Sequence, residues 1–568
     1  MAKITEANVI RSSLWAAYGD AIGFPTELVS ASEFKKRNSA AEVSKPIAWH
    51  RRVGGMFGPD VAFPEGSYSD DTQLRLSSGR AINGRGFFDV ESFAKIELPV
   101  WLNYALGAGR GSKAAAANLA LRDSSWSLNF FSTASTKYWE GGGNGAAMRI
   151  QPHVWQNHAG PQRAFLSDVI RNSVCTHGHP RAIVGAIIHA ALLFETLRSG
   201  EAVRPSDWSG IGETVAQIGI EMLAADPELP LVWIPSWERF AKRNLKEVWA
   251  KTTEEWVQAS RLAASVCERN SADPALAYVA ILKELNGFDP AERGSGLKTP
   301  LYASALAWLY RDRSPEEALA SAANVFGSDT DTIATMAGAL IGAIAQVEPT
   351  GALQDAKYLR SEASRLFHIG NNEQERTFEY PDLLSWNAPR NQSDAWVSDG
   401  EGERLAGIGL IRPYGPTYKP KKGTELVWQW AELDFGQTVL VKRRAAQVLV
   451  GNSIGVRKLM SEGVSPSAAK KVSEAKPTTL ATKAQASLLA DDAQLPLDEV
   501  SPLTVRIDAV PASPISLDAL TQQCIRGGFD PTYIGNALLG LMQGPEPIER
   551  AIAFAAIIAK AKVVRSPK

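Results

Sequence analysis

Two short acidic segments, far apart in the sequence, are the strongest constraint on how this chain folds. Ser69–Thr72 reads Ser-Asp-Asp-Thr and Asp329–Thr332 reads Asp-Thr-Asp-Thr, and each stands at the expected start of a helix. Carboxylate and hydroxyl oxygens suit Mg²⁺, Mn²⁺ or Ca²⁺, whereas Zn²⁺ or copper prefers His and Cys, which neither segment contains. The pair predicts an oxygen-ligated metal centre and a fold that brings the two helix starts together.

Taken alone, each acidic segment has a simpler explanation. Ser69 is a natural N-cap, and the helix dipole and free backbone N–H groups favour acidic residues in a first turn. However, Asp329 and Asp331 precede an otherwise apolar helix that does not require them. Neighbouring carboxylates repel each other and raise each other's pKa unless a cation screens them. A dinuclear metal centre would remove that conflict, so we favour it over capping for the pair.

Composition bounds the class of protein. At 568 residues the chain exceeds the usual size of one hydrophobic core, so two or three domains are expected. The 60 Lys and Arg balance 61 Asp and Glu, which gives no net field toward nucleic acid or an anionic membrane. Three widely spaced cysteines argue against a disulfide framework and fit a reducing compartment.

The apolar segments give no sign of membrane insertion. The first residues lack an apolar signal core, and the most apolar runs, Ala182–Phe194 and Ile333–Ala345, are too short to span a bilayer. We therefore expect a cytoplasmic protein with no membrane partner.

Helical spacing dominates the first two thirds of the chain. Apolar residues recur on one helical face from Ile10 to Tyr18, from Ile183 to Phe194 and from Ile333 to Ile344. These segments are rich in Ala and Gly, which permits close helix packing. Alternating strand patterns are scarce before residue 400. We predict one all-α domain over residues 1–385, in which long loops such as Ser44–Ser67 are functional.

The chain changes character after residue 385. Residues 404–460 carry Pro, Gly, Trp and Val in short runs that predict a small β-containing module. Residues 461–510 are rich in Ser, Ala, Lys and Pro, which predicts a flexible linker. Helical spacing returns over residues 511–568 and predicts a small helical C-terminal unit. We expect the C-terminal units to bind a partner or to mediate oligomerisation.

Two further segments resemble ligand-binding loops. Gly141–Met148 is a glycine-rich loop ahead of a helix, which could present backbone N–H groups to a pyrophosphate. It has neither a Walker lysine nor a Rossmann strand, so kinase and dehydrogenase functions lose support, and a plain turn is an equal alternative. Thr176–Pro180 reads Thr-His-Gly-His-Pro and opens a helix, where an imidazole could bond a phosphate or a ribose hydroxyl. A capped helix start with exposed histidines is the favoured alternative there.

Five motifs, read together, closely resemble the ADP-ribosylglycohydrolase family and stand in that family's order. They are Gly19–Gly23 with Glu27, Tyr68–Thr72, Gly143–Arg149, Thr176–Pro180 and Gly327–Ala339. The match covers residues 5–350, so the rest of the chain takes no function from it. The resemblance implies an all-α fold of orthogonal helices with a dinuclear Mg²⁺ or Mn²⁺ centre in a cleft. It also implies hydrolysis of the bond that joins ADP-ribose to an acceptor.

The resemblance assigns roles to particular positions. The residues it places in catalysis are Glu27, Asp70 and Asp71. Those it places around ribose and phosphate are Gly143, Asn144, Gly145, Met148 and His177. The ligands it implies for two Mg²⁺ or Mn²⁺ ions are Ser69, Asp70, Asp71, Asp329, Asp331 and Thr332. Asp20 is expected to support the cleft. Some family members carry an aromatic residue where this chain has Gly141–Gly143, which would leave base stacking to Tyr138 or Trp139.

The expected reaction removes ADP-ribose from a modified acceptor, with a protein side chain as the first choice. Water would attack C1 of the ribose while Glu27 or Asp70 handles the proton. The partner would be an ADP-ribosylated protein or another ADP-ribose conjugate, and a nucleic-acid acceptor stays open. Two other classes stay open as well: a catalytically silent ADP-ribose-binding module, and a metal-dependent phosphoesterase, which would liberate phosphate or AMP.

Overall fold

The structure is a computed structural model, and the residues that it describes are 4–38, 40–270, 272–399, 402–423, 425–445, 516–541 and 547–565. The expected linker at 461–510 lies outside the described residues, as do residues 446–460 of the expected β-containing module.

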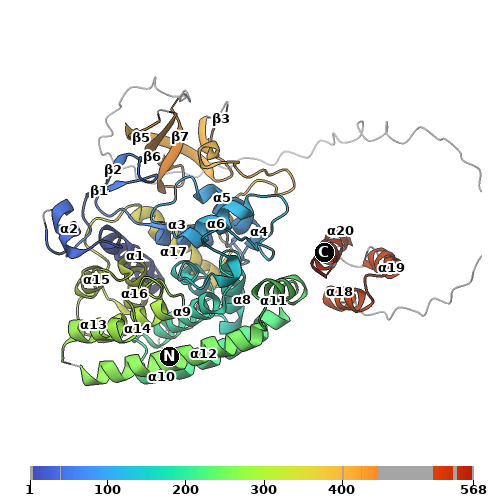
Figure 1. Ribbon diagram of the computed structural model, residues 1–568, viewed down its shortest axis with the longest axis horizontal. Coiled ribbons are helices and arrows are strands. Elements are labelled where there is room, and N and C mark those ends of the chain that lie inside the picture. The colour runs from blue at the N-terminus through green and yellow to red at the C-terminus, as the bar shows by residue number, and fades with distance from the viewer. Residues whose placement is uncertain are drawn as a thin grey trace, which may run out of the picture. The chain divides into compact units, whose positions relative to one another are not determined.

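Helices make up most of the chain up to residue 370 (Figure 1). The first group is α1 (Glu6–Gly23), α2 (Ala31–Asn38), α3 (Asp70–Arg80), α4 (Val90–Ser92), α5 (Leu98–Trp101), α6 (Arg110–Leu119), α7 (Gln151–Trp155) and α8 (Gln162–Val174). The second group is α9 (Pro180–Ser199), α10 (Pro205–Ala225), α11 (Ile234–Ala241), α12 (Leu245–Arg269), α13 (Pro274–Glu284), α14 (Lys298–Leu309), α15 (Pro315–Ala323), α16 (Thr330–Ile344) and α17 (Ala356–Gly370). The predicted helical fold of this region is confirmed.

The helices α1 and α16 pack tightly against each other because glycines on both let the backbones approach. A Cβ atom on Gly19 would lie 2.2 Å from the carbonyl oxygen of Ala334, and one on Gly338 would lie 2.2 Å from that of Trp15. Later residues of α1 thus meet earlier residues of α16, so the two helices are antiparallel. The carboxyl end of α1 therefore lies beside the amino end of α16, which carries Asp331.

The segment Ser44–Ser67 contains a β-hairpin, which the sequence did not indicate and which adds a small sheet to the helical domain. Its strands β1 (Trp49–Arg52) and β2 (Asp60–Phe63) pair antiparallel, with Trp49 opposite Phe63. Each strand has four residues, too few for an alternating pattern to stand out in the sequence. Their apolar side chains are buried in a cluster with Trp428 and Trp430 from the far end of the chain, a contact that no local pattern reveals.

A five-stranded antiparallel sheet follows the helices and confirms the expected β structure in the C-terminal region. Its strands, in spatial order, are β3 (Trp396–Asp399), β4 (Gly402–Leu405), β5 (Gly409–Tyr418), β6 (Leu426–Leu433) and β7 (Thr438–Arg444). The β5–β6 register shifts between Tyr414 and Tyr418, where Gly415 and Pro416 interrupt regular pairing. Buried side chains of the sheet, such as Leu433 and Val439, belong to the same hydrophobic core as the helices.

Three helices near the end of the chain form a small cluster of their own. They are α18 (Leu517–Arg526), α19 (Pro531–Leu541) and α20 (Pro547–Arg565), in agreement with the expected helical unit. Their shared core contains Cys524, Leu541 and Phe554. Cys524, like Cys175 and Cys267, is a buried free thiol.

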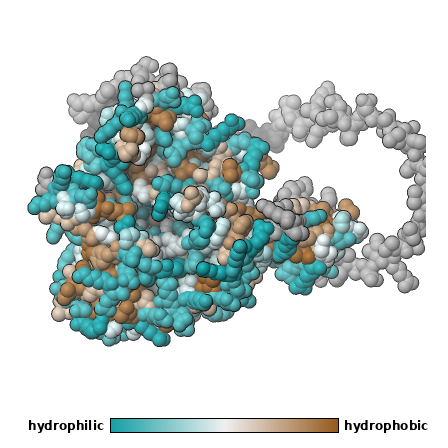
Figure 2. All heavy atoms as spheres, viewed as in Figure 1, coloured by the Kyte–Doolittle hydropathy of each residue, from teal (hydrophilic) through white to brown (hydrophobic). Residues whose placement is uncertain are grey.

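One described helix, α9, is long and apolar enough to cross a membrane by length and composition alone. It has 20 residues and so extends beyond the run Ala182–Phe194 seen in the sequence, and 83% of its apolar window is buried inside the protein. It packs against α8, α10 and α16 as a core helix. Hydrophilic residues predominate on the face of the molecule seen in Figure 2, with apolar residues in scattered patches.

Candidate metal centre and active site

The two acidic segments meet at one cavity of about 600 Å³, within the usual size range of small-molecule sites. The predicted site residues that line it are Glu27, Asp70, Asp71, Gly143, Asn144, Gly145, Met148, His177, Asp329, Asp331 and Thr332. Ser69 is buried and does not line the cavity. Its hydroxyl donates to Oδ2 of Asp71 at 3.0 Å. The tertiary structure thus brings together Glu27 from the segment after α1, the first residues of α3 and α16, and residues of the loops at 143–145 and 177.

The start of α3 is held in place from α1. Ser69 caps α3 and its hydroxyl accepts a hydrogen bond from the backbone N–H of Asp71. The buried carboxylate of Asp20 accepts from the backbone N–H of Ser69 at 2.8 Å and from that of Thr72 at 2.9 Å. Asp20 does not line the cavity, so its contacts agree with the supporting role expected for it.

Burial raises the pKa of three of the aspartates that line the cavity well above the ordinary value. Asp70, Asp71 and Asp331 all show this effect, and the negative charges of neighbouring carboxylates, including Glu27 and Asp20, add to it. Ionising all of these groups at once therefore costs free energy in the protein alone. A bound cation would offset that cost.

Glu27 lies just beyond the carboxyl end of α1, after a short 3₁₀ turn at Phe24–Thr26. Burial raises the pKa of Glu27 to about 7, although the nearby Arg51 guanidinium lowers it. The Arg51 Nη1 atom lies 3.5 Å from Oε2 of Glu27. A carboxyl group that titrates near neutral pH is suited to exchange a proton with a reacting group.

The donor atoms around the cavity fit a hard cation by their chemistry. Within the described ranges, no cluster of three Asp, Glu, His or Cys side chains has the arrangement of a metal site. However, Oδ1 of Asp71 is buried and has no hydrogen-bond partner among the described residues, and Oδ1 of Asp331 accepts from the adjacent backbone N–H of Thr332. Buried oxygens of this kind suit Mg²⁺ or Mn²⁺ rather than a softer metal.

The glycine-rich loop forms one wall of the cavity. The backbone N–H of Asn144 donates to the carbonyl oxygen of Gly294 at 3.0 Å, and its side-chain Nδ2 donates to Oδ2 of Asp329 at 2.8 Å. A Cβ atom on Gly145 would lie 2.9 Å from Oγ of Ser112 and 3.0 Å from the His177 ring. The loop is therefore tied to the acidic segment at 329, and the glycine lets the two walls approach closely.

The two histidines of the Thr176–Pro180 motif have different places. His177 lines the cavity, and its Nδ1 lies 2.7 Å from the Thr176 hydroxyl. Burial and the nearby Arg149 lower the pKa of His177 to about 3, so its imidazole is neutral at physiological pH. His179 caps α9 by accepting from the backbone N–H of Arg181, which confirms the expected cap. The expected exposure of both histidines is wrong, because His177 is buried and His179 is partly buried.

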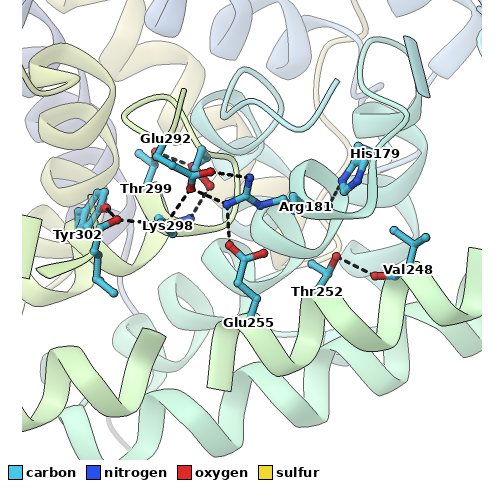
Figure 3. A network of polar contacts seen from close by, with 11 residues as sticks. His179, Arg181, Val248, Thr252, Glu255, Glu292, Lys298, Thr299 and Tyr302 are labelled. Carbon is cyan, nitrogen blue, oxygen red and sulfur yellow. Dashed lines mark hydrogen bonds and ion pairs between the residues drawn. The ribbon is translucent and has the colours of Figure 1, made fainter. Parts of the chain in front are cut away.

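A polar network lies behind the cavity wall (Figure 3). Arg181 of α9 donates to Glu255 of α12 at 2.6 Å and to Glu292 at 2.7 Å, and Lys298 of α14 pairs with Glu292 at 2.7 Å. Glu292 also accepts, through its carbonyl oxygen, from the backbone N–H of Ser295. The network thus holds the turn that presents Gly294 to Asn144.

Several cavity residues were not anticipated from the sequence. Three of them are basic: Arg110, Lys137 and Arg293. The local sequence signal for two of these positions is the neighbouring glycines, which flank Arg110 and follow Arg293 and indicate tight turns there. Phe131 is the aromatic residue that lines the cavity. Tyr138 is buried, and its hydroxyl donates a hydrogen bond to the carbonyl oxygen of Val174. Trp139 stacks on Phe240 at a ring-centroid distance of 5.2 Å. Neither of the aromatic residues proposed for base stacking lines the cavity.

Comparisons with known proteins relate this chain to one family. The family described as ADP-ribosylglycohydrolase matches residues 4–374. A solved chain described as "ADP-ribosylglycohydrolase-related protein complex" is similar, with 20% sequence identity and a TM-score of 0.39. The similarity covers 64% of this chain and 98% of that one. No curated protein matches this sequence significantly. The match over residues 4–374, which spans most of the chain and all five motifs, shows that the chain belongs to the ADP-ribosylglycohydrolase family.

Proposed function

We propose that this chain is a metal-dependent hydrolase that removes ADP-ribose from a modified acceptor, with a protein side chain as the proposed acceptor. The family supports glycohydrolase activity on ADP-ribosylated substrates. The observation that carries the proposal is that the carboxylates of α3 and α16 line one cavity together with Glu27. Water would attack C1 of the ribose, and ADP-ribose would leave intact.

The proposed cofactor is a pair of Mg²⁺ or Mn²⁺ ions. The side chains that would hold them are Ser69, Asp70, Asp71, Asp329, Asp331 and Thr332. When bound, such ions neutralise carboxylates and polarise hydroxyl and water oxygens. The support for this assignment is the all-oxygen donor set, the raised pKa values of Asp70, Asp71 and Asp331, and the unpartnered buried oxygen of Asp71.

Side chains of the cavity would carry out proton transfer, charge stabilisation and substrate binding. Glu27 would accept the proton of the attacking water, because its pKa of about 7 suits a general base near neutral pH. The neighbouring carboxylates would stabilise the positive charge that develops on the ribose ring. His177 is neutral and would contribute hydrogen bonds rather than charge. Gly143, Gly145 and Met148 would shape the wall against ribose and phosphate.

Positive charge for a pyrophosphate would come from arginines in the cavity wall. Arg110 and Arg293 both line the cavity. A guanidinium group can donate to two phosphate oxygens at once. These two residues are therefore the proposed counterparts of the diphosphate.

A panel of ADP-ribosylated acceptors tests the proposal. Peptides modified on arginine or on serine, and ADP-ribosylated DNA, would be incubated with Mg²⁺, with Mn²⁺ or with EDTA, and the products identified by mass. Release of intact ADP-ribose that EDTA abolishes supports the proposal. Release of AMP or phosphate would indicate a phosphoesterase. Tight binding of ADP-ribose without release from any conjugate would indicate a silent binding module.

A further inference from the structure

We propose that Arg51 is a positioning residue for Glu27, and that the carboxy-terminal sheet holds Arg51 in place through the β1–β2 hairpin. The inference rests on the proposed function, because Arg51 would position the Glu27 carboxylate, which is proposed to accept the proton of the attacking water. It assigns a task to strands β6 and β7, which lie beyond the matched family segment.

The first contact links the hairpin to Glu27. Arg51 lies on β1, and among the described side chains it is the one that donates to the Glu27 carboxylate, at 3.5 Å. Its guanidinium also lies over the Phe24 ring, 4.7 Å from the centroid. Phe24 opens the 3₁₀ turn that ends just before Glu27. Arg51 thus contacts both the carboxylate and the turn that carries it.

The second contact links the sheet to the hairpin. Trp430 of β6 meets Phe63 of β2 edge to face, with ring centroids 5.6 Å apart, and its indole N–H donates to the carbonyl oxygen of Ala62 at 3.1 Å. Phe63 in turn packs on Trp49 at 5.0 Å. Trp49 and Arg51 are two residues apart on one strand and therefore share a face. A continuous chain of contacts leads from the sheet to Glu27.

Phe24, in the 3₁₀ turn before Glu27, belongs to the same aromatic cluster as the hairpin and the sheet. Phe24 contacts Trp49 at 5.1 Å and Phe63 at 6.0 Å, and all three side chains are buried together with Trp428, Trp430 and Leu440 of the sheet. Leu106 also belongs to this cluster, and its carbonyl oxygen accepts from the backbone N–H of Asp70 at 2.7 Å. The same cluster therefore touches the segments that carry Glu27 and Asp70.

A separate contact links the sheet to the residue that precedes the cap of α3. Oδ2 of Asp355 accepts from the backbone N–H of Thr438 on β7 at 2.7 Å and from the hydroxyl of Tyr68 at 2.5 Å. Tyr68 directly precedes Ser69, the cap of α3. The sheet thus contacts the active-site segments at two places. Two contacts of this kind can fix the positions of those segments, as expected for a supporting element.

Enzyme kinetics on the full chain test the role of Arg51. We expect Arg51→Ala to lower kcat about 10- to 100-fold with KM nearly unchanged, because a misplaced proton acceptor affects the transition state more than binding. Arg51→Lys should recover part of the loss. In a Glu27→Gln background Arg51→Ala should change the residual rate less than about 2-fold, because a positioning residue acts only through its target. The matched control is Arg52→Ala, on the exposed neighbour in the same strand, which should keep wild-type kcat.

Hydrogen exchange tests the link without any turnover. Trp430→Ala should speed backbone exchange in residues 47–63 and in residues 24–30, whereas Trp430→Phe, which keeps the ring contact with Phe63, should change both segments less. Unchanged exchange at residues 24–30 in Trp430→Ala would overturn the link from the sheet. Wild-type kcat in Arg51→Ala would overturn the positioning role. If the wild-type protein released no ADP-ribose, the proposed function would fail, and the exchange result would still decide whether the sheet holds the Glu27 turn.

Discussion

Asp20 holds Thr72 by two hydrogen bonds to one oxygen atom: Oδ2 of Asp20 accepts from the backbone N–H of Thr72 at 2.9 Å and from its hydroxyl at 2.6 Å. The pair joins α1 to the first turn of α3, where Asp70 and Asp71 lie. Burial raises the pKa of Asp20, and its hydrogen bonds oppose that effect. Asp20 therefore acts on the acidic site through the backbone of α3.

Removing the Asp20 carboxylate should destabilise the protein. We expect Asp20→Ala to lower the free energy of unfolding by about 3 kcal/mol, because buried N–H and O–H donors lose their acceptor. The shift of the urea unfolding midpoint measures the effect. The control is Asp60→Ala, which removes an exposed carboxylate from β2 and should cost less than about 0.5 kcal/mol. Equal midpoints for the two variants would contradict this account of Asp20.

Neutralising the acids of α16 should separate activity from stability. We expect Asp329→Asn and Asp331→Asn to lower kcat at least about 1000-fold, since each removes a proposed ligand. Burial raises the pKa of Asp331, so its ionised form is unfavourable in the metal-free fold at neutral pH. Asp331→Asn should therefore melt at the same or a higher temperature than the wild type in EDTA. Circular dichroism and turnover assays check both parts, and wild-type turnover in either variant would refute the ligand assignment.

Divalent cations should stabilise the fold. A ligand that binds only the folded state adds about 2.7 kcal/mol at a concentration 100 times its dissociation constant. We therefore expect Mn²⁺ or Mg²⁺ to raise the melting temperature and EDTA to reverse the rise. Asp71→Asn should reduce the effect, because this residue contributes the unpartnered buried oxygen. Differential scanning calorimetry measures the shift, and identical melting curves with Mn²⁺ and with EDTA would exclude the proposed centre.

The network behind the cavity predicts a pH-dependent contribution to stability. Burial opposes ionisation of Glu292, but hydrogen bonds from Arg181 and Lys298 outweigh it and hold its pKa at about 2, below the ordinary 4.5. A depressed folded-state pKa contributes stability above pH 4.5 that is lost as the pH falls toward 2. The melting temperature of Glu292→Gln should thus lie below that of the wild type at pH 6, and the gap should narrow between pH 4.5 and 2. If the difference in melting temperature between the two proteins grew as the pH fell from 4.5 to 2, the lowered pKa of Glu292 would be contradicted.

The contact between α1 and α16 makes a steric prediction. Gly338→Ala would place a Cβ atom 2.2 Å from the carbonyl oxygen of Trp15, so the helices must separate, and we expect a loss of about 2 kcal/mol or more. The matched control is Gly210→Ala in α10, where a Cβ atom meets nothing within 4 Å. That change should stabilise the protein by about 0.5–1 kcal/mol, because alanine is the better helix former. Thermal unfolding of both variants provides the comparison.

The parts of the site that follow from local sequence were predictable. Helical spacing of apolar residues indicated α1, α9 and α16, and a hydroxyl residue before two acids indicated the start of α3. Each of these features depends on residues within a few positions of one another. The five motifs also located many of the cavity residues, because every residue assigned to catalysis, to metal binding or to ribose and phosphate, except Ser69, lines the cavity.

The hairpin β1–β2 and its role could not be predicted in the same way. Its strands are short, and their burial depends on Trp428 and Trp430, which lie hundreds of positions later in the chain. The same holds for the Arg51–Glu27 ion pair and for the basic side chains in the cavity wall, since nothing near them in the sequence marks their partners.

By itself the amino-acid sequence determined the kind of helices this protein forms, the family to which it belongs and the acidic residues that meet at its cavity. These depend on short-range spacing and on motifs, which a sequence states directly. Only the tertiary structure decided which distant segments support those residues: the sheet behind the hairpin, Arg51 against Glu27, and Glu292 behind the glycine loop. Such contacts arise from the packing of the whole chain, because burial and charge pairing depend on neighbours in space.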